Sequence, residues 1–122
     1  LAFHYVSPDD MILGGDINSR DDDPSNDGAG DPGFSVALEA GARNLRGFVG
    51  LAHPEGEQDK GNSQFYILLQ NKPELDGRYT VFAQVVEGLN VVEKISRLPA
   101  GPDGQPREKV VMKKVYNTER FI

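Results

Sequence analysis

The stretch Gln64-Phe65-Tyr66-Ile67-Leu68-Leu69 is the clearest strand signal in the chain, because aromatic and branched apolar side chains gather in it without a break. Similar short apolar runs lie before and after it, separated by the glycine, proline and aspartate residues that are typical of turns. Strands are therefore predicted at residues 2–6, 11–13, 34–38, 47–52, 64–69, 81–86 and 109–116.

One helix interrupts this pattern near the C-terminal end. Val91, Val92, Ile95 and Leu98 follow the spacing of a short amphipathic helix, which Pro99 and the glycine after it should end. A hairpin-like break is predicted at residues 76–77, between two of the strands. With 122 residues, the chain is predicted to be one mainly β, mostly antiparallel domain, either a small barrel or a sandwich.

Residues 14–33 lack strand or helix periodicity and are predicted to be a surface excursion, with an acidic loop at 17–33. Six aspartates opposed by Arg20 alone give this region five of the six net negative charges of the chain. Two uses are considered. The loop could recognise a basic partner in a salt-dependent way. Its aspartate spacing also echoes a calcium-binding EF-hand loop, but Phe34 occupies the place of the required glutamate, so a solvated loop is favoured.

Composition excludes several classes of function. The chain has no clustered lysine and arginine for nucleic acid, and no run of about 18 apolar residues to span a membrane. It contains no cysteine, which fits a soluble protein of either the cytoplasm or the periplasm. His4 and His53 are too isolated to indicate a metal site, and no cofactor is predicted.

The two ends of the chain are physically awkward for a closed barrel. The sequence opens directly on an apolar strand, and the last predicted strand has no obvious partner nearby in the sequence. Exposed strand edges with unpaired backbone groups are normally avoided. We therefore expect an N-terminal segment of a longer protein to complete the sheet.

Five short motifs follow one another along the chain, namely Phe3-His4 with Met11, Gly14-Gly15-Asp16, Ser63-Gln64-Phe65-Tyr66, Leu75-Asp76-Gly77 with Val81-Phe82, and Glu87-Gly88. In their order and spacing they resemble the motifs of the cyclophilins, a family of peptidyl-prolyl cis-trans isomerases. The resemblance implies an eight-stranded antiparallel barrel with capping helices, spanning residues 1–122. Two strands and the first helix of the family fold would be absent at the N-terminal side, which agrees with the expected missing segment.

The resemblance also implies where catalysis would occur. In cyclophilins an arginine follows the Phe-His pair and donates a hydrogen bond to the prolyl nitrogen, and here that position holds Tyr5. A phenol is a neutral donor near pH 7, and charge-assisted hydrogen bonds are about twice as strong as neutral ones. Removing a transition-state donor costs about 10² to 10³ in rate, so reduced activity is predicted. Gln64 is the second catalytic position carried over.

The substrate slot implied by the family is partly kept. Met11, Ala52, Tyr66 and Leu75 would form the apolar grip on a proline ring, and His53 stands where the family has asparagine. Four further positions depart from the family pattern, namely Asp10, Leu13, Glu74 and Tyr79. For Phe3, Phe65 and Phe82, burial in the core is the favoured interpretation.

Three functions are weighed. The first is a prolyl isomerase of reduced activity that acts on X-Pro bonds of protein clients. The second is a non-catalytic peptide-binding or structural subunit of a larger assembly that retains the barrel. The third, a generic β-barrel ligand-binding domain, leaves the ordered motifs unexplained.

Overall fold

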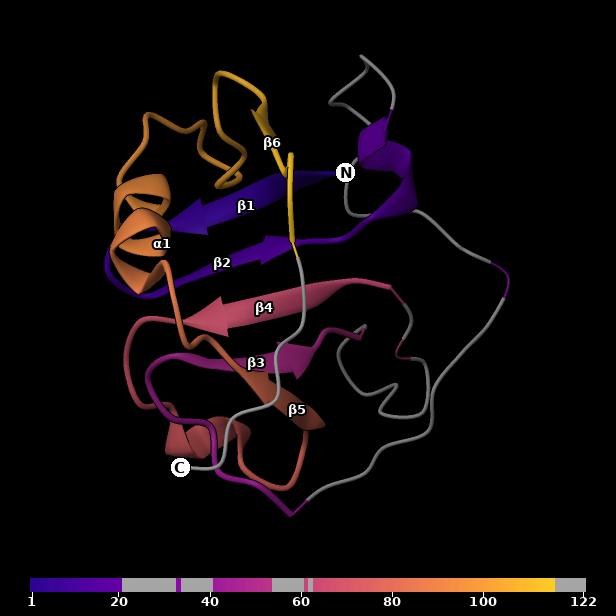
Figure 1. The fold of residues 1–122 in the computed structure, drawn as a ribbon, viewed down its shortest axis with the longest axis vertical. Coiled ribbons are helices and arrows are strands. Elements are labelled where there is room, and N and C mark those ends of the chain that lie inside the picture. The colour runs from indigo at the N-terminus through magenta and orange to yellow at the C-terminus, as the bar shows by residue number, and fades with distance from the viewer. Residues whose placement is uncertain (21–32, 34–40, 54–60, 62, 116–122) are drawn as a thin grey trace.

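The computed structural model describes residues 1–20, 33, 41–53, 61 and 63–115. Within these ranges, six strands form one antiparallel sheet in the order β5-β3-β4-β2-β1-β6 (Figure 1). The strands are β1 (Ala2–Ser7), β2 (Met11–Gly14), β3 (Phe48–Leu51), β4 (Phe65–Leu68), β5 (Val81–Gln84) and β6 (Val110–Val111). One α-helix, α1 (Leu89–Ser96), and two short 3-10 helices, η1 (Ile17–Arg20) and η3 (Pro73–Leu75), complete the described elements.

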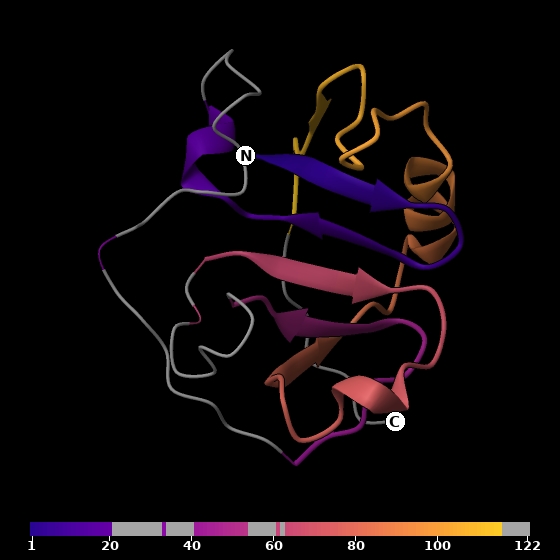
Figure 2. The ribbon, with the colours of Figure 1, turned by 180° about the vertical axis from the view of Figure 1, so that it is seen from behind.

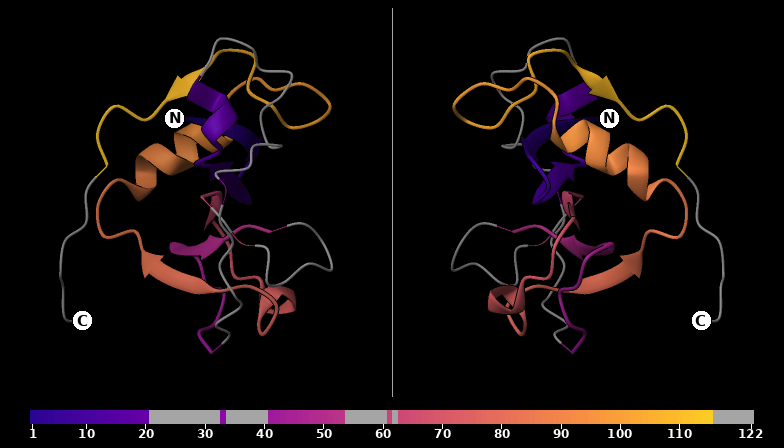
Figure 3. Two further views of the ribbon diagram at one scale, coloured as in Figure 1. Left: turned by 90° about the vertical axis from the view of Figure 1, so that its right-hand side faces the viewer. Right: turned by 90° about the vertical axis from the view of Figure 1, so that its left-hand side faces the viewer.

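The core lies between one face of the sheet and α1. Val6, Ile12, Ile67 and Val49 are paired in register across four neighbouring strands, so their side chains point to the same face and are all buried. Seen edge-on, α1 and β5 lie on the same side of β1 and β2 (Figure 3). The helix adds buried Val92 to this cluster, because apolar residues every three positions along α1 face the sheet.

A β-bulge in β1 changes which side chains face the core. Phe3 pairs with Gly14 of β2, whereas Tyr5 pairs with Leu13, so His4 is the extra residue. As a result Phe3 and Tyr5 lie on opposite faces of the sheet. Phe3 packs edge-on against Phe65 with ring centroids 6.2 Å apart. A side chain at Gly14 would collide with this packing, because an added Cβ would lie 2.8 Å from Cδ1 of Phe3.

The mainly β, antiparallel fold and the single helix are confirmed, although the sheet formed by the described residues is not closed. Five of the predicted strands occur within two residues of their expected limits. The strand predicted at 34–38, and most of the acidic loop, lie outside the described residues. None of the helices in the described ranges has the length and apolar character to cross a bilayer.

Several predictions about individual side chains were wrong. Phe82 is 58% exposed because it lies on β5, which is at the edge of the sheet that the described residues form and pairs there with β3 alone. Val91 and Leu98 are exposed as well, since α1 ends at Ser96 and buries the face that carries Val92. Asp16 was expected on the surface but is fully buried. Its backbone carbonyl accepts hydrogen bonds from the backbone N–H and the hydroxyl of Ser19, which lies in η1.

The pairing of two segments also differs from the prediction. The last strand, β6, is shorter than predicted and pairs with β1, with Val111 opposite Ala2 and Val110 opposite Phe3. A partner that is far away in sequence therefore protects this edge of β1. The break at residues 76–77 is not a hairpin, because β4 and β5 on either side of it both pair with β3 and not with each other.

Candidate functional site

The candidate site lies on the face of the sheet opposite the core. Tyr5, Leu13, Tyr66 and Gly50 are paired in register across β1, β2, β4 and β3, so they form one row on this face. Seen from behind, these four strands face the viewer, and α1 lies beyond them (Figure 2). The bulge at His4 is what brings Tyr5 into this row.

Other predicted site residues lie on the same face, before and after this row along the strands. Met11 pairs with Ser7 and Leu68, one step along the strands from Leu13. On the other side, the carbonyl of Gln64 accepts a 2.9 Å hydrogen bond from the backbone N–H of Ala52. Gln64 lies two residues before Tyr66, so it shares the face of that residue. The result is a surface of apolar and amide groups around Tyr66.

Tyr66 forms the floor of this surface. Its side chain is buried and covers Gly50, where any β-carbon would overlap the phenol ring. Its hydroxyl donates a hydrogen bond to Oδ1 of buried Asn44. The orientation of Asn44 is fixed in turn by Asp76, whose Oδ1 accepts hydrogen bonds from the Asn44 backbone N–H at 2.6 Å and from Nδ2 at 3.2 Å.

The hydrogen bonds among Tyr66, Asn44 and Asp76 determine whether the Tyr66 hydroxyl can donate to a ligand. Burial raises the pKa of Tyr66 well above its usual range, and the nearby charge of Asp76 acts in the same direction. The phenol therefore remains protonated, and its single proton is committed to Asn44. Tyr66 therefore contributes a buried aromatic ring beneath this face and no free hydroxyl donor.

Aromatic rings form one wall beside Tyr66. The ring of Tyr79 meets the Tyr66 ring edge-on at 5.7 Å, and His53 stacks on the other side of Tyr79 at 4.1 Å with 13° between the planes. His53 Nε2 lies 2.9 Å from the backbone carbonyl of Arg78. Because a carbonyl only accepts, this nitrogen carries a proton. The stack thus presents an amphipathic wall next to the floor.

A polar cluster occupies the end of the face near Met11. Asp10 forms an ion pair with Lys72 at 2.6 Å and accepts hydrogen bonds from Gln70 at 2.8 Å and Ser7 at 3.1 Å. Partial burial acts to raise the pKa of Asp10, but the hydrogen bonds from Lys72, Gln70 and Ser7 outweigh it, and the pKa is lowered overall. A charged pair therefore stands where the resemblance implies an aromatic side chain.

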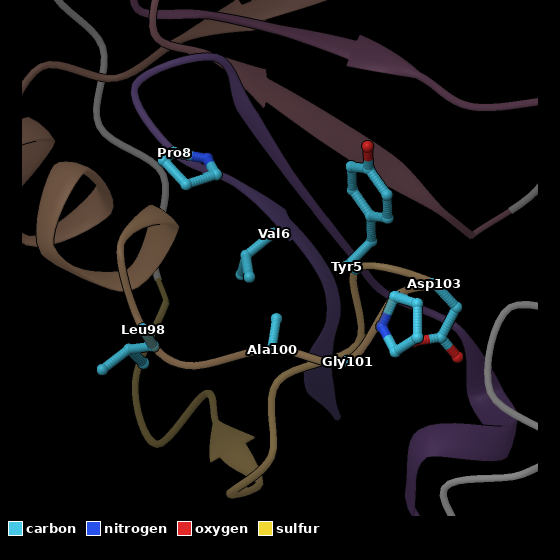
Figure 4. Close-up of a pocket in the computed structure, with 9 residues that line it drawn as sticks. Tyr5, Val6, Pro8, Leu98, Ala100, Gly101 and Asp103 are labelled. Atoms are coloured by element: carbon cyan, nitrogen blue, oxygen red, sulfur yellow. The ribbon is translucent and has the colours of Figure 1, made fainter.

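Tyr5 is positioned by the loop that follows α1. The backbone N–H of Val6 donates a 2.7 Å hydrogen bond to the carbonyl of Gly104, which joins β1 to this loop. The ring of Tyr5 packs against Gly104, because an added Cβ there would lie 2.5 Å from the ring. Figure 4 shows the Tyr5 side chain leaving β1 on the side opposite Val6, which agrees with the strand register.

The structure therefore brings together most of the residues singled out from the sequence. Tyr5, Met11, Ala52, Gln64 and Tyr66 share one face, with Tyr5 about two strand spacings, or about 10 Å, from Tyr66. His53 joins them through the ring of Tyr79. Leu75 lies on η3, the short helix that directly precedes Asp76.

Sequence reasoning missed the residues that hold the floor in place. Asn44 and Asp76 are 32 residues apart, and a polar residue in each of two turns gives no signal that they will meet.

No group of metal-ligating side chains occurs within the described ranges. Within the described ranges, the face thus presents apolar, aromatic and amide groups together with the Tyr5 phenol.

Comparison with protein families gives a single family across nearly the whole chain. The model described as "Cyclophilin type peptidyl-prolyl cis-trans isomerase/CLD" matches residues 1–117. "Peptidyl-prolyl cis-trans isomerase-like 2" of Gibberella zeae is 31% identical over 124 residues, which cover 94% of this chain and 19% of that protein. "Probable peptidyl-prolyl cis-trans isomerase" of Brucella abortus is 33% identical over 111 residues, which cover 80% of this chain and 52% of that protein.

A third relative carries a different description. "Probable inactive peptidyl-prolyl cis-trans isomerase-like 6" of Mus musculus is 37% identical over 98 residues, which cover 80% of this chain and 30% of that protein. The chain thus spans 52% or less of the length of these three curated relatives.

Among solved structures, a cyclophilin type peptidyl-prolyl cis-trans isomerase of Cryptosporidium parvum, determined in the presence of the dipeptide Ala-Pro, has the same fold. Its TM-score is 0.79 at 22% identity, and the match covers 97% of this chain and 75% of that one.

Proposed function

Since this chain belongs to the cyclophilin type peptidyl-prolyl cis-trans isomerase family, we propose that it binds X-Pro segments of protein clients and accelerates their isomerisation weakly. The observation that carries the proposal is the register that aligns Tyr5, Leu13 and Tyr66 on one face. The shared face supports a site in which Tyr5, at the arginine position, and Tyr66 contact the same ligand from two strands apart.

The reaction needs little chemistry from the protein. Rotation about the X-Pro bond is opposed by amide resonance, with a barrier of about 18 to 20 kcal/mol. In the twisted transition state, the lone pair of the prolyl nitrogen becomes localised and can accept a hydrogen bond. A site that grips the ring and directs a donor at that nitrogen therefore lowers the barrier.

The residues of this chain divide these tasks. Tyr66 and Met11 supply apolar surface for the ring, and the Tyr66 hydroxyl is held away from the substrate by Asn44. Tyr5 is the donor. Because its hydroxyl is neutral, it stabilises the localised lone pair less than a guanidinium would, and we expect a rate about 10² to 10³ below that of an arginine-containing site.

The choice of substrate is supported by a relative of the same fold. The Cryptosporidium parvum protein was crystallised in the presence of Ala-Pro, which is the smallest peptide with an X-Pro bond. We propose the same class of ligand for this chain.

A second function is favoured by specific observations. Asp10, which is paired with Lys72, and the exposed Glu74 occupy positions where the family resemblance implies aromatic side chains. One of the relatives is described as probably inactive. In this alternative, the domain binds proline-containing segments without turnover, as a subunit of a larger assembly.

The deciding experiment compares the cis-to-trans rate of a short X-Pro peptide in the presence of the natural protein, Tyr5→Arg and Tyr5→Phe. The phenylalanine variant is the matched control, since it keeps the ring that packs against Gly104 and removes only the hydroxyl. We expect weak acceleration by the natural protein, about 10²-fold more by Tyr5→Arg, and none by Tyr5→Phe. Peptide binding is measured separately by calorimetry.

Each other result has a definite meaning. Binding without acceleration by any variant would replace the isomerase with the non-catalytic alternative. Equal rates for the natural protein and Tyr5→Phe would remove Tyr5 from the role of donor. A folded protein that binds no X-Pro peptide would overturn both functions.

A further inference from the structure

A pocket of about 370 Å³ has Tyr5 in its lining. One wall is the β1 segment that runs from Tyr5 through Val6 to Pro8, and the other is the loop at residues 98–104 that follows α1. Figure 4 shows Pro8 and Leu98 toward one end of this pocket, and Tyr5 and Asp103 toward the other. Tyr5 thus belongs both to this pocket and to the face proposed to bind the X-Pro segment.

The walls of the pocket are held in place before any ligand binds. The backbone N–H of Gly101 donates to the carbonyl of Gln105 at 2.9 Å, and Ala100 and Pro106 form an isolated β-bridge. The Val6 to Gly104 hydrogen bond fixes this loop to β1 at 2.7 Å. A preformed site saves the ligand the entropic cost of ordering it.

The pocket combines apolar walls with one charge. Pro8, Leu98 and Ala100 provide aliphatic surface. Asp103 is the only lining residue with a charged side chain, and its Oδ1 accepts one hydrogen bond, from the backbone N–H of Gln105 at 3.1 Å. Among the described residues, no lysine, arginine or histidine forms an ion pair with it.

The two charged residues that adjoin Pro8 and Leu98 in the sequence neutralise each other. Asp9 follows Pro8, Arg97 precedes Leu98, and these two residues form an ion pair at 2.7 Å. A ligand in the pocket therefore meets the unbalanced negative charge of Asp103 at the end next to Tyr5.

We propose that this pocket is a second subsite of the peptide groove, which takes a lysine or arginine side chain of the client near its proline. The aliphatic stem of such a residue packs against Ala100 and the neighbouring apolar wall, and its cationic head pairs with Asp103. This inference rests on the proposed function and deepens it, because it names the class of client as X-Pro segments with a neighbouring basic residue.

The test uses peptides with a common Ala-Pro core and lysine, alanine or glutamate placed in turn at each flanking position. Binding to the full chain is measured by calorimetry at low ionic strength, for the natural protein, Asp103→Asn and Glu108→Gln. The asparagine keeps an oxygen for the Gln105 N–H and removes the charge. Glu108→Gln is the matched control, since it removes one exposed negative charge outside the pocket lining.

At one flanking position, we expect the natural protein and Glu108→Gln to bind the lysine peptide about threefold more tightly than the alanine peptide, and the glutamate peptide more weakly. Asp103→Asn should bind lysine and alanine peptides equally. The preference should fade as the salt concentration rises toward about 1 M, where the Debye length falls to about 3 Å.

Three results would overturn the subsite. If lysine and alanine peptides bind equally to the natural protein at every position, the pocket does not select a cation, while the X-Pro function stands. If Asp103→Asn and Glu108→Gln lower the preference equally, the overall negative charge of the protein is responsible for the preference, and Asp103 has no special part in it. If no core peptide binds to the folded protein, the proposed function fails and the subsite fails with it.

Discussion

The ring of Tyr5 and the backbone of Gly104 are in such close contact that a β-carbon added to Gly104 would lie 2.5 Å from Cε2 and 2.6 Å from Cδ2 of the ring. Gly104 also has a φ of 83°, which disfavours residues with a β-carbon. The glycine therefore lets the loop after α1 close onto the residue proposed to be the donor, and it fixes the position of that donor relative to β1.

The first prediction tests this contact. Gly104→Ala should destabilise the fold by about 1 to 3 kcal/mol more than Gly77→Ala, measured as the free energy of unfolding in urea. Gly77 is a matched control because its φ is 79°, yet an added Cβ would meet no atom within 4 Å. The two variants share the backbone cost, about 1 to 2 kcal/mol, and differ in the collision with Tyr5.

A double variant separates the two causes further. In a Tyr5→Ala background the collision with the ring is gone and only the tight 3.3 Å approach to the Val6 carbonyl remains, so most of the extra cost of Gly104→Ala over Gly77→Ala should disappear. Equal costs for the two glycine variants in the natural background would contradict the close packing of Tyr5.

The second prediction concerns the hydroxyl of Tyr66. Tyr66→Phe leaves Oδ1 of buried Asn44 without its donor, so the free energy of unfolding should fall by about 1 to 3 kcal/mol. Tyr79→Phe is the control, because the Tyr79 hydroxyl makes no hydrogen bond with the described residues, and its loss should cost less than about 0.5 kcal/mol. If the two substitutions had the same effect, the Asn44 network would not be holding the floor.

The third prediction is a pH dependence of stability. The folded-state pKa of Asp10 lies below the ordinary value of 3.8, so ionised Asp10 stabilises the fold fully above pH 3.8. This stabilisation is lost as the pH falls below 3.8 through the folded-state pKa. Asp10→Asn should therefore flatten part of the fall in unfolding free energy between about pH 5 and about pH 2.

Lys72→Met provides the companion measurement, because it removes the ion-pair partner and leaves the carboxylate in place. The carboxyl pKa of Asp10, followed by NMR, should move up toward its ordinary value in that variant. A pKa that does not move would show that Lys72 does not stabilise the charge.

Local patterns in the sequence were enough to find most of the secondary structure. The runs around Ile12, Val49 and Ile67 carry the branched apolar residues of strands, and all three are buried in the core. The motif order also identified the family and placed Tyr5, Gln64 and Tyr66 among the site residues.

The remainder depended on contacts between distant segments. No local signal marks His4 as a bulge, since a bulge is defined by the register of β1 against β2. Phe82 resembles the buried aromatics of the other strands, and only its place on an edge strand exposes it. The Asn44 to Asp76 hydrogen bonds likewise join two turns that the sequence keeps 32 residues apart.

Because of the bulge at His4, the residues of β1 that pack in the core and the residue at position 5 lie on different faces of the sheet. Without the extra residue, the side chain at position 5 would share a face with Phe3, and every substitution there would disturb core packing. With it, β1 contributes Phe3 and Val6 to stability, while position 5 stays outside the core. The side chain at position 5 can therefore change without repacking the core, so the fold does not depend on which residue stands there.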